Sequence, residues 1–373
     1  MFRPSLKNNW SLIGLTILSI VLFYIAQSSY RQIQSPWFEE KLSSAQKMDT
    51  AINLLKNESI NRGYSIDKIN DPSETGLVGA SVSTITTSRG TLSERLVTLN
   101  PNFSAAIVDI LKKADLHEGD YVAVGVTGAN PGANLALYCA LETLKLRPII
   151  ITSVGSATYG ANRELFTWLD METTLYENAI TSFYSEYASI GGSNDLGRGL
   201  PPEGRLNLIR AIERNNRILI NGLNLDDNVQ LRLDVYENLL PEGKRYKAFI
   251  NLGAGVGSVG SLVNAKIIST GIHKRLGEKD FKEPGTMMFF SKKNIPVIHL
   301  YNINKIVSDY KLPKNSYPMP KPGTGSLFST KINNVIIAII CWIVLMSAII
   351  AVILFDRNDR HFTSNIIDPD EEL

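Results

Sequence analysis

The residues best suited to chemistry fall in glycine-rich turns that follow short apolar runs. The first turn spans 127–134 and the second spans 153–162. A β-branched apolar run before each turn is typical of a strand buried on both faces of a parallel sheet. The first turn opens an expected helix, and a helix N-terminus attracts anions such as carboxylate or phosphate. Its residues that we expect to contact a ligand are Thr127, Gly128, Asn130 and Asn134. The turn has no lysine and no G-x-x-x-x-G-K-[ST] motif, so a nucleoside triphosphate is not the expected ligand.

The second turn holds two serines, Ser153 and Ser156, which are expected ligand contacts and candidate nucleophiles. A catalytic serine needs a base, and His273 is the candidate for that role. Three carboxylates could complete such a group: Asp170, Asp195 and Asp234. Neither serine lies in a G-x-S-x-G motif, so the strained turn of an α/β-hydrolase is not expected. Hydroxyls that satisfy the local backbone are the simpler interpretation, and the catalytic residues therefore stay unassigned.

A third glycine-rich loop follows the predicted strand 247–252. Gly255, Gly257 and Gly260 satisfy G-x-G-x-x-G directly after this strand, which is the context of a dinucleotide fingerprint. The residues after them resemble a strand as much as a helix, and nicotinamide cofactors are scarce outside the cytoplasm, so no cofactor is expected. The glycines are instead interpreted as allowing a tight turn or the approach of a small group. Gly255, Gly257 and Ser258 join the expected ligand contacts.

The elements that position these turns alternate between strands and helices. Tyr121–Val126 reads as a strand, Ala133–Leu146 as a helix and Ile149–Thr152 as the next strand, which makes a right-handed βαβ unit. Ligands of open α/β sheets bind beyond the carboxyl ends of the strands. Further strands are expected at 218–221, 247–252, 266–269, 285–290 and 295–300, and helices at 42–62, 100–114, 162–179, 203–215, 226–240 and 302–310. We predict an α/β, Rossmann-like fold with a largely parallel sheet and helices on both faces.

Two apolar segments at the ends of the chain, Trp10–Ala26 and Val335–Phe355, are long enough to cross a membrane. The first could be a cleaved signal peptide, but no small-x-small cleavage site follows it, so an uncleaved anchor is expected. Arg3 and Lys7 favour a cytoplasmic start, although lysines also precede the second span. The expected organisation is a cytoplasmic N-terminus (1–9), a transmembrane helix (10–27), a stalk helix (28–63), an extracytoplasmic α/β domain (64–311), a Pro-rich spacer (312–331), a second transmembrane helix (332–355) and an acidic cytoplasmic tail (356–373).

Charge is distributed unevenly along the 373 residues. Residues 28–243 carry 19 Lys and Arg against 26 Asp and Glu, whereas residues 244–331 carry 15 against 4. A basic region suits an acidic polymer or anionic lipid headgroups, and simple solvation beside a membrane span explains it equally well. Lys274 and Arg275 are its expected ligand contacts. Cys139 is the only cysteine outside the second span, and no H-E-x-x-H motif occurs, so neither an internal disulfide nor a metal site is expected.

Several segments together resemble the poly-γ-glutamate system protein family. They are the start MFRPSLKNNW, the Thr-rich stretch TITTSRG, the turns GVTGANPGANLAL and SVGSATYGAN, and the loop INLGAGVGSVGS. The resemblance covers nearly the full length but supplies no catalytic signature. It implies a membrane accessory protein of poly-γ-glutamate synthesis or export, with the membrane subunits of the synthase as partners.

These observations lead to one expected function and one alternative. We expect a two-pass protein of the cell (inner) membrane with an extracytoplasmic domain that binds the anionic polymer or the synthase complex, and no nucleic-acid partner. The alternative is an extracytoplasmic serine hydrolase or transpeptidase-like enzyme that acts on γ-glutamyl or cell-wall peptide bonds.

Overall fold

A computed structural model describes residues 9–277, 281, 283–314 and 317–364, and only the backbone of 355–364. It contains two compact units. One is formed by the two ends of the chain, up to Ser35 and from Ser329, and the other spans Pro36–Phe328. The expected cytoplasmic N-terminus, except residue 9, and the second half of the expected acidic tail lie outside the described residues.

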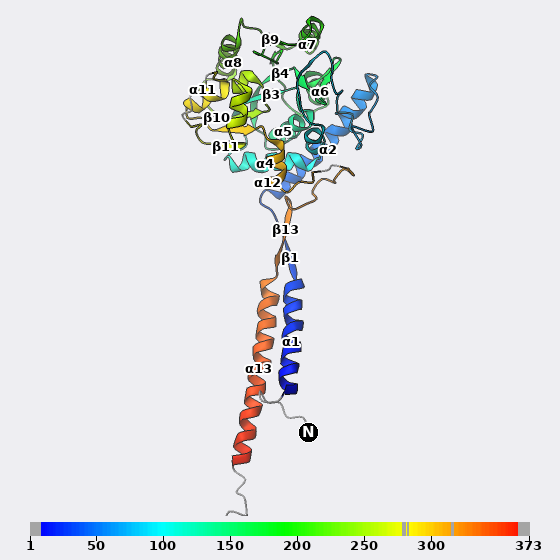
Figure 1. The fold of residues 1–373 in the computed structure, drawn as a ribbon. Helices are drawn as coiled ribbons and strands as arrows, with labels where there is room; N and C mark the ends of the chain where they lie inside the picture. The colour runs from blue at the N-terminus through cyan, green and yellow to red at the C-terminus, as the bar shows by residue number, and fades with distance from the viewer. Residues whose placement is uncertain (1–8, 278–280, 282, 315–316, 365–373) are drawn as a thin grey trace, which may run out of the picture. The chain divides into compact units, whose positions relative to one another are not determined.

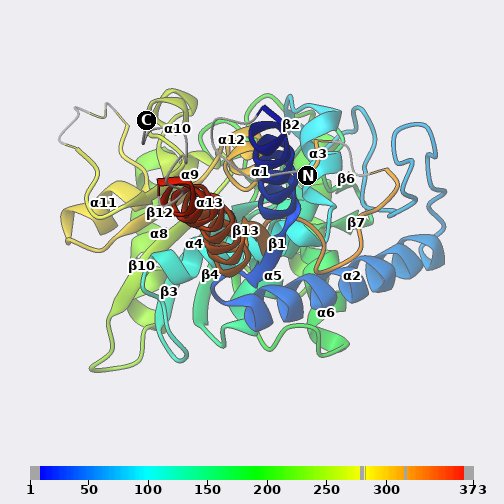
Figure 2. The ribbon, with the colours of Figure 1, turned by 90° about the horizontal axis from the view of Figure 1, so that it is seen from below.

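The first unit pairs the two ends of the chain. Its elements are α1 (Asn9–Ser28), β1 (Tyr30–Gln34), β13 (Ser329–Asn333) and α13 (Val335–Ser364). Strands β1 and β13 are antiparallel, from the pair Tyr30 and Asn333 to the pair Gln34 and Ser329. Helices α1 and α13 lie side by side in the side view and in the view from below (Figures 1 and 2). Helix α1 and residues 335–354 of α13 are each long and apolar enough to cross a membrane. The sequence did not predict the β1–β13 pair.

The second unit is built on a seven-stranded sheet in the order β11-β12-β10-β3-β4-β8-β9. The strands are β3 (Tyr121–Thr127), β4 (Arg147–Ser153), β8 (Tyr187–Ser189), β9 (Ile218–Ile220), β10 (Tyr246–Leu252), β11 (Gly271–His273) and β12 (Val297–Leu300). Neighbouring strands are parallel except at the edge, where β11 is antiparallel to β12. The predicted α/β class with a largely parallel sheet is confirmed.

Helices and two small strand pairs surround this sheet. The helices are α2 (Phe38–Asn61), α3 (Leu92–Thr98), α4 (Asn102–Lys113), α5 (Pro131–Thr143), α6 (Trp168–Glu177), α7 (Pro202–Arg214), α8 (Leu225–Leu239), α9 (Val256–Val259), α10 (Leu262–Ile267), α11 (Thr286–Lys292) and α12 (Ile303–Asp309). The small pairs are β2 (Thr86–Ser88) with β5 (Ser156–Ala157), and β6 (Asn162–Arg163) with β7 (Phe166–Thr167).

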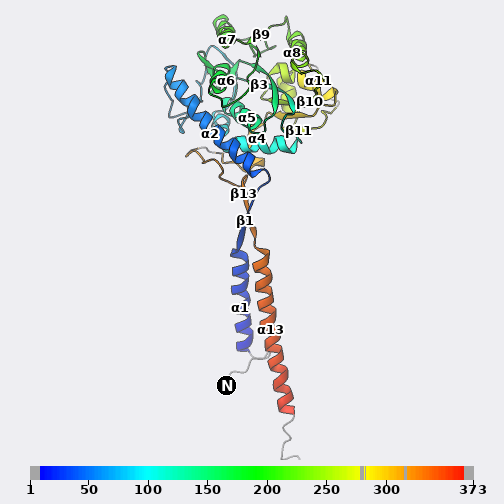
Figure 3. The ribbon, with the colours of Figure 1, turned by 180° about the vertical axis from the view of Figure 1, so that it is seen from behind.

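Side chains alternate between two cores on opposite faces of the sheet, as the strand geometry requires. Val122, Val124 and Val126 of β3 pack in one core with α2, α4 and α5. Ala123 of the same strand and Phe249 of β10 pack in the other, with α8 and α11. Figure 3 shows β3 between α2 on one side and α8 and α11 on the other. The helices therefore cover both faces, as predicted.

The order of the strands creates a crevice beside β3. The chain runs from β3 through β4 and β8 to β9 in one direction, and then continues with β10 and β12 on the other side of β3. The connections that leave β3 and β10 consequently diverge at the carboxyl ends of these strands. Such a switch point is where open α/β sheets bind their ligands.

Helix α2, which we expected to be a stalk, is part of the second unit. Met48 and Leu55 on one face of this helix are fully buried in the core shared with α4 and α5. The ammonium group of Lys41 is also buried, 2.6 Å from the carboxylate of Asp109 on α4. The compact unit therefore begins and ends further out in the sequence than the expected domain at 64–311.

Three predicted elements were wrong in type or extent. Residues 266–269 and 285–290, predicted as strands from their β-branched and aromatic content, lie largely in or next to helices α10 and α11. The Ser261 side chain accepts a hydrogen bond from the Asn264 amide, so a helix cap outweighs strand propensity at α10. The predicted helix at 162–179 contains the β6–β7 hairpin before α6 begins.

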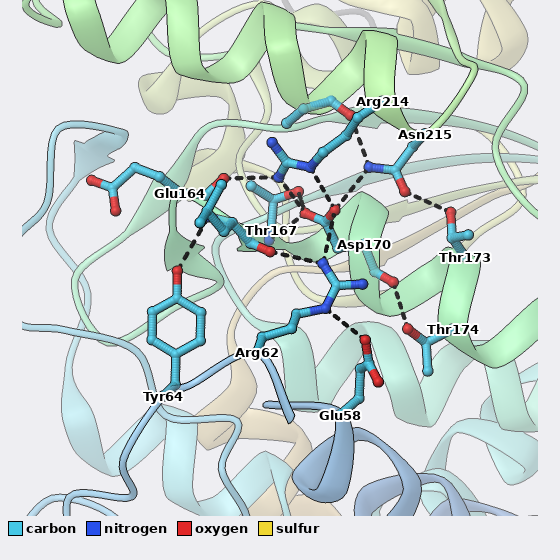
Figure 4. Close-up of polar contacts among 12 residues, drawn as sticks. Glu58, Arg62, Tyr64, Glu164, Thr167, Asp170, Thr173, Thr174, Arg214 and Asn215 are labelled. Atoms are coloured by element: carbon cyan, nitrogen blue, oxygen red, sulfur yellow. Dashed lines mark hydrogen bonds and ion pairs between the residues drawn. The ribbon is translucent and has the colours of Figure 1, made fainter. Parts of the chain in front are cut away.

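Asp170 joins this hairpin region to two helix ends (Figure 4). Its carboxylate accepts two hydrogen bonds from Arg214 at 2.7 and 2.6 Å and one from the Asn215 side chain at 3.0 Å. Arg62, near the end of α2, lies 3.4 Å from the same carboxylate. The Thr167 hydroxyl and amide also donate to it, forming a capping box at the start of α6. Asp170 is 2% exposed and fully bonded, so we assign it a structural role.

Candidate functional site

Two adjoining cavities open at the carboxyl ends of the central strands. One has a volume of about 120 Å³ and the other of about 540 Å³. They share five lining residues: Ser88, Thr127, Ala129, Ala254 and Leu262. We call the two together the strand-end cleft. Its walls follow β3, β4, β8, β10 and β12, so it lies at the switch point between β3 and β10.

The wall of the smaller cavity is a buried cluster around Asp195 and Arg232. The two side chains form an ion pair at 2.8 Å, and both are at most 1% exposed. Arg232 also donates to the hydroxyls of Ser153 at 2.8 Å and Ser189 at 2.6 Å. Both hydroxyls in turn donate to the Asp195 carboxylate, at 3.1 and 2.8 Å. The charges and hydroxyls thus satisfy one another, which a buried ion pair requires.

Gly257 is explained by this cluster. A Cβ at this position would lie 2.4 Å from Nε of Arg232 and 2.9 Å from the Asp195 carboxylate. The small group that approaches the third glycine-rich loop is therefore the guanidinium of Arg232. Gly255 lines the smaller cavity, whereas Ser258 is buried away from both cavities against Gly125 of β3.

The described chain brings no histidine to either candidate serine. His273 lies on β11, four strands from β4, which is about 19 Å across the sheet. Its Nε2 is 2.6 Å from the Ser269 carbonyl oxygen. The Ser156 hydroxyl is buried and donates to the Gly128 carbonyl oxygen at 2.8 Å. Ser153 lines the cleft, but its hydroxyl is bonded to Arg232 and Asp195, and it has no histidine partner among the described residues.

His299 is fully buried on β12, next to Leu300, which lines the larger cavity. Burial lowers the pKa of its imidazole to about 4. Its Nδ1 lies 3.0 Å from the Asn251 side-chain amide and its Nε2 lies 3.1 Å from the Ala265 carbonyl oxygen. A neutral ring that accepts at Nδ1 and donates at Nε2 fits both contacts.

The first turn, residues 127–134, lines the cleft and caps helix α5, and it does not present a series of free backbone amides to a ligand. Thr127 lines both cavities, and Asn130 lines the larger one. The Asn130 side chain caps α5 by accepting from the Ala133 amide at 3.2 Å. The Gly128 amide donates to the Ser153 carbonyl oxygen at 3.0 Å. Asn134 is fully buried, and its side chain donates to the Thr127 carbonyl oxygen, so it supports the turn from below.

Cations outnumber acids in the larger cavity. Of the residues that the structure describes, Arg89, Arg95 and Lys266 line it together with a single acid, Glu94. Arg89 and Lys266 are exposed, whereas Arg95 is 7% exposed and burial lowers the pKa of its guanidinium to about 10. None of these three was named from the sequence. The sequence did contain a signal for α3. The pattern Thr91-x-x-Glu94 is typical of a helix start, and Thr91 does cap this helix, which carries Arg95 directly after Glu94.

Lys274 and Arg275 lie away from the cleft. Lys274 lines a groove of about 780 Å³ at the amino ends of β10 and β12, on the opposite edge of the sheet. Among the described residues, five cations line this groove against one acid, Asp115: Lys113, Arg245, Lys247, Lys274 and Lys293. Arg275 borders a smaller pocket of about 70 Å³ beside α11. The expected ligand contacts are thus divided between two edges of the sheet.

The fold and the cleft define a class: an α/β protein with two apolar terminal helices and a cation-lined cleft at the switch point of its sheet. Among the described residues, no three His, Cys, Asp or Glu side chains are grouped so that they could hold a metal ion. Comparison with protein-family models, curated proteins and solved structures found no match.

Proposed function

We propose that this chain binds the carboxylates of an anionic polymer in the strand-end cleft, and that the polymer is poly-γ-glutamate. The observation that carries this proposal is the larger cavity, where Arg89, Arg95 and Lys266 face one acid. An excess of cations in a concave site raises the local concentration of an anionic ligand. The resemblance of the glycine-rich segments to the poly-γ-glutamate system protein family supplies the choice of polymer.

The proposed architecture is a Rossmann-like domain outside the cytoplasm, held by two spans in the cell (inner) membrane. The strand order on either side of β3 supports the Rossmann-like assignment. The length and apolarity of α1 and of residues 335–354 support the spans. Arg3 and Lys7 before the first span support a cytoplasmic start. In this arrangement the spans contact the membrane subunits of the synthase, and the domain handles the polymer.

The amino-edge groove around Lys274 is the competing surface for the polymer. Its cations come from α4, β10 and the segments that flank β11 and β12, and they are largely exposed. Lys293 is already paired with Glu237, and Lys113 with Asp109 at 2.6 Å. We favour the cleft because it combines cations with the edge of the sheet where ligands of α/β folds bind.

Matched charge reversals separate the two surfaces. The full chain in detergent or nanodiscs is titrated with a short γ-linked glutamate oligomer at fixed salt. We expect Arg89→Glu with Lys266→Glu to weaken binding at least about tenfold, because two attractive charges become repulsive at the cleft. The matched pair Lys247→Glu with Lys274→Glu changes the net charge by the same amount, but at the groove. We expect it to have a small effect on the affinity.

The opposite result would place the polymer-binding site in the amino-edge groove. If the groove variant loses affinity and the cleft variant does not, the polymer binds at the amino edge. If the wild-type chain shows no affinity for the oligomer, the proposed function is wrong.

A further inference from the structure

Arg95 is a buried cation without an acceptor. Its Nε is buried and has no hydrogen-bond partner among the described residues. The side chain is 7% exposed and lines the larger cavity. An unpaired buried charge is strongly unfavourable, which is why buried arginines are normally paired.

The surroundings hold this guanidinium at the cavity wall. A Cβ at Gly90 would lie 2.0 Å from Nη2 of Arg95, so a larger residue at this position would displace the guanidinium. The amide and carbonyl groups of Gly90 are both hydrogen-bonded to the Thr158 hydroxyl, at 2.8 and 2.7 Å. The nearest charged neighbour, Glu94, favours the charged form of Arg95 without forming an ion pair with it.

Asn130 supplies a second unpartnered donor in the same cavity. Its Oδ1 accepts from the Thr98 hydroxyl at 2.8 Å and from the Ala133 amide at 3.2 Å, which fixes the orientation of the side-chain amide. Its Nδ2 is buried and has no partner among the described residues. Thr98 also donates to the Arg95 carbonyl oxygen at 2.9 Å, so this one hydroxyl links the two donor-bearing residues.

We propose that Arg95 and Asn130 form the anchoring subsite for a single carboxylate group of the ligand. This inference rests on the proposed function, because it names the residues that hold the ligand in the same cleft. A planar guanidinium fork binds a planar carboxylate through two parallel hydrogen bonds, and the Asn130 amide adds one more donor. One buried positive charge matches one carboxylate, whereas a phosphate dianion would bring a second charge that no buried cation balances. Arg89 and Lys266 at the exposed part of the cavity are available to further carboxylates.

The test combines binding and stability of the same variants in the full chain. Arg95→Met keeps the packing of the aliphatic stem but removes the charge and the donors. We expect binding of a γ-linked glutamate dimer to weaken about 10- to 100-fold, since a charged hydrogen-bonded pair is lost. In the absence of the dimer, we expect the Tm to rise by about 2–4 °C, because an unpaired buried charge has been removed.

Asn130→Asp is an isosteric second variant. It keeps the oxygen that caps α5 and accepts from Thr98, but it replaces the free donor with negative charge in the same cavity. We expect it to fold, to be at least as stable as the wild type and to lose binding of the dimer by the same order. Free inorganic phosphate and a dimer with its carboxylates amidated serve as probes of the ligand class. Neither is expected to compete with the intact dimer.

Arg163 provides a matched control. It is a partly buried arginine whose guanidinium donates to Ser59, Gly76 and Val78, at 2.6, 3.1 and 3.2 Å. Arg163→Met is expected to lower the Tm and leave the affinity unchanged.

The outcomes separate this inference from the proposed function. If Arg95→Met lowers the Tm and keeps the affinity, Arg95 is a structural residue and the subsite is wrong, even if the reversal at Arg89 and Lys266 still weakens binding. Tighter competition by phosphate than by glutamate oligomers would also overturn the carboxylate assignment. If the dimer does not bind the wild-type chain at all, both the inference and the proposed function fail.

Discussion

Arg95 and Arg232 are both buried arginines, and they differ in what surrounds the guanidinium. Arg232 forms an ion pair with Asp195 and donates hydrogen bonds to Ser153 and Ser189, so its charge is balanced within the fold. Arg95 meets a glycine backbone and an open cavity. This contrast is the physical basis for assigning Arg232 to the structure and Arg95 to a ligand.

At the same scale, His299 predicts how stability depends on pH. Its pKa is lowered to about 4 in the folded chain, against about 6.5 in an unfolded one. As the pH falls, His299 is therefore protonated in the unfolded state before it is protonated in the folded state. The free energy of unfolding that this residue contributes above pH 6.5 is lost as the pH falls toward 4. The loss amounts to at most about 3 kcal/mol. Urea unfolding at pH 7 and pH 4.5, for the wild type and His299→Gln, measures it.

Other buried titratable groups also make the stability depend on pH, so this prediction needs a control. Burial raises the pKa of Glu172, which gives the opposite sign in an overlapping pH range. The quantity to compare is therefore the difference between the wild type and His299→Gln at each pH. A difference that is the same at pH 7 and pH 4.5 would contradict the role assigned to His299.

At the scale of elements, the Asp170 cluster determines how the β6–β7 hairpin is attached to α2 and α7. Burial alone would raise the pKa of Asp170, but hydrogen bonds from Arg214, Thr167 and Asn215 outweigh it and hold the pKa below its usual value. Its carboxylate thus stays ionised and pairs with two arginines.

Asp170→Asn leaves Arg214 without a countercharge, and Arg62 keeps only its pair with Glu58. We expect the free energy of unfolding to fall by about 1–3 kcal/mol, because charge-assisted hydrogen bonds are lost around arginines that are 31% and 29% exposed. The matched control is Glu118→Gln, which breaks the exposed pair with Lys145 and is expected to cost less than about 1 kcal/mol. If urea unfolding shows the same decrease in the free energy of unfolding for both variants, burial of the Asp170 cluster does not add to stability.

Much of the sheet and several helices could be predicted from local sequence. The strand Tyr121–Val126 and the helix Ala133–Leu146 match β3 and α5 within a few residues, because apolar runs and glycine or proline punctuation are local signals. Helices α10 and α11 were missed because they are short and rich in residues that favour strands, so side-chain capping and packing decide them.

The candidate site was predictable in position but not in composition. Thr127 and Ser153 line the cleft because they end strands, and strand ends follow from the sequence pattern. Arg95 lies on an amphipathic helix, where an arginine is usually solvated. Its guanidinium lies against Gly90, and this contact depends on how the chain folds before α3.

At the scale of the whole molecule, the membrane topology of the chain can be tested with a single cysteine. Both native cysteines are buried, Cys139 in the core of the second unit and Cys341 on α13. The turn 241–245 between α8 and β10 is exposed. Glu242→Cys therefore introduces one accessible thiol.

We expect a membrane-impermeant maleimide to label Glu242→Cys in intact cells, because the proposal places the domain outside the cytoplasm. Wild-type protein, which lacks an accessible thiol, is the control for background labelling. Labelling that occurs only after the cells are lysed would place the domain inside and reverse the proposed orientation.

The ribbon formed by β1 and β13 brings Gln34 and Ser329 opposite each other, and the rings of Phe38 and Phe328 lie 6.2 Å apart at the two ends of the second unit. The whole of that unit is thus an insertion between two neighbouring points of the backbone. A short linker from Phe328 to Pro36 would close it, and new termini at the exposed turn 241–245 would open it again without cutting a strand of the sheet. We expect such a circularly permuted chain to keep the cleft while it lacks both apolar helices.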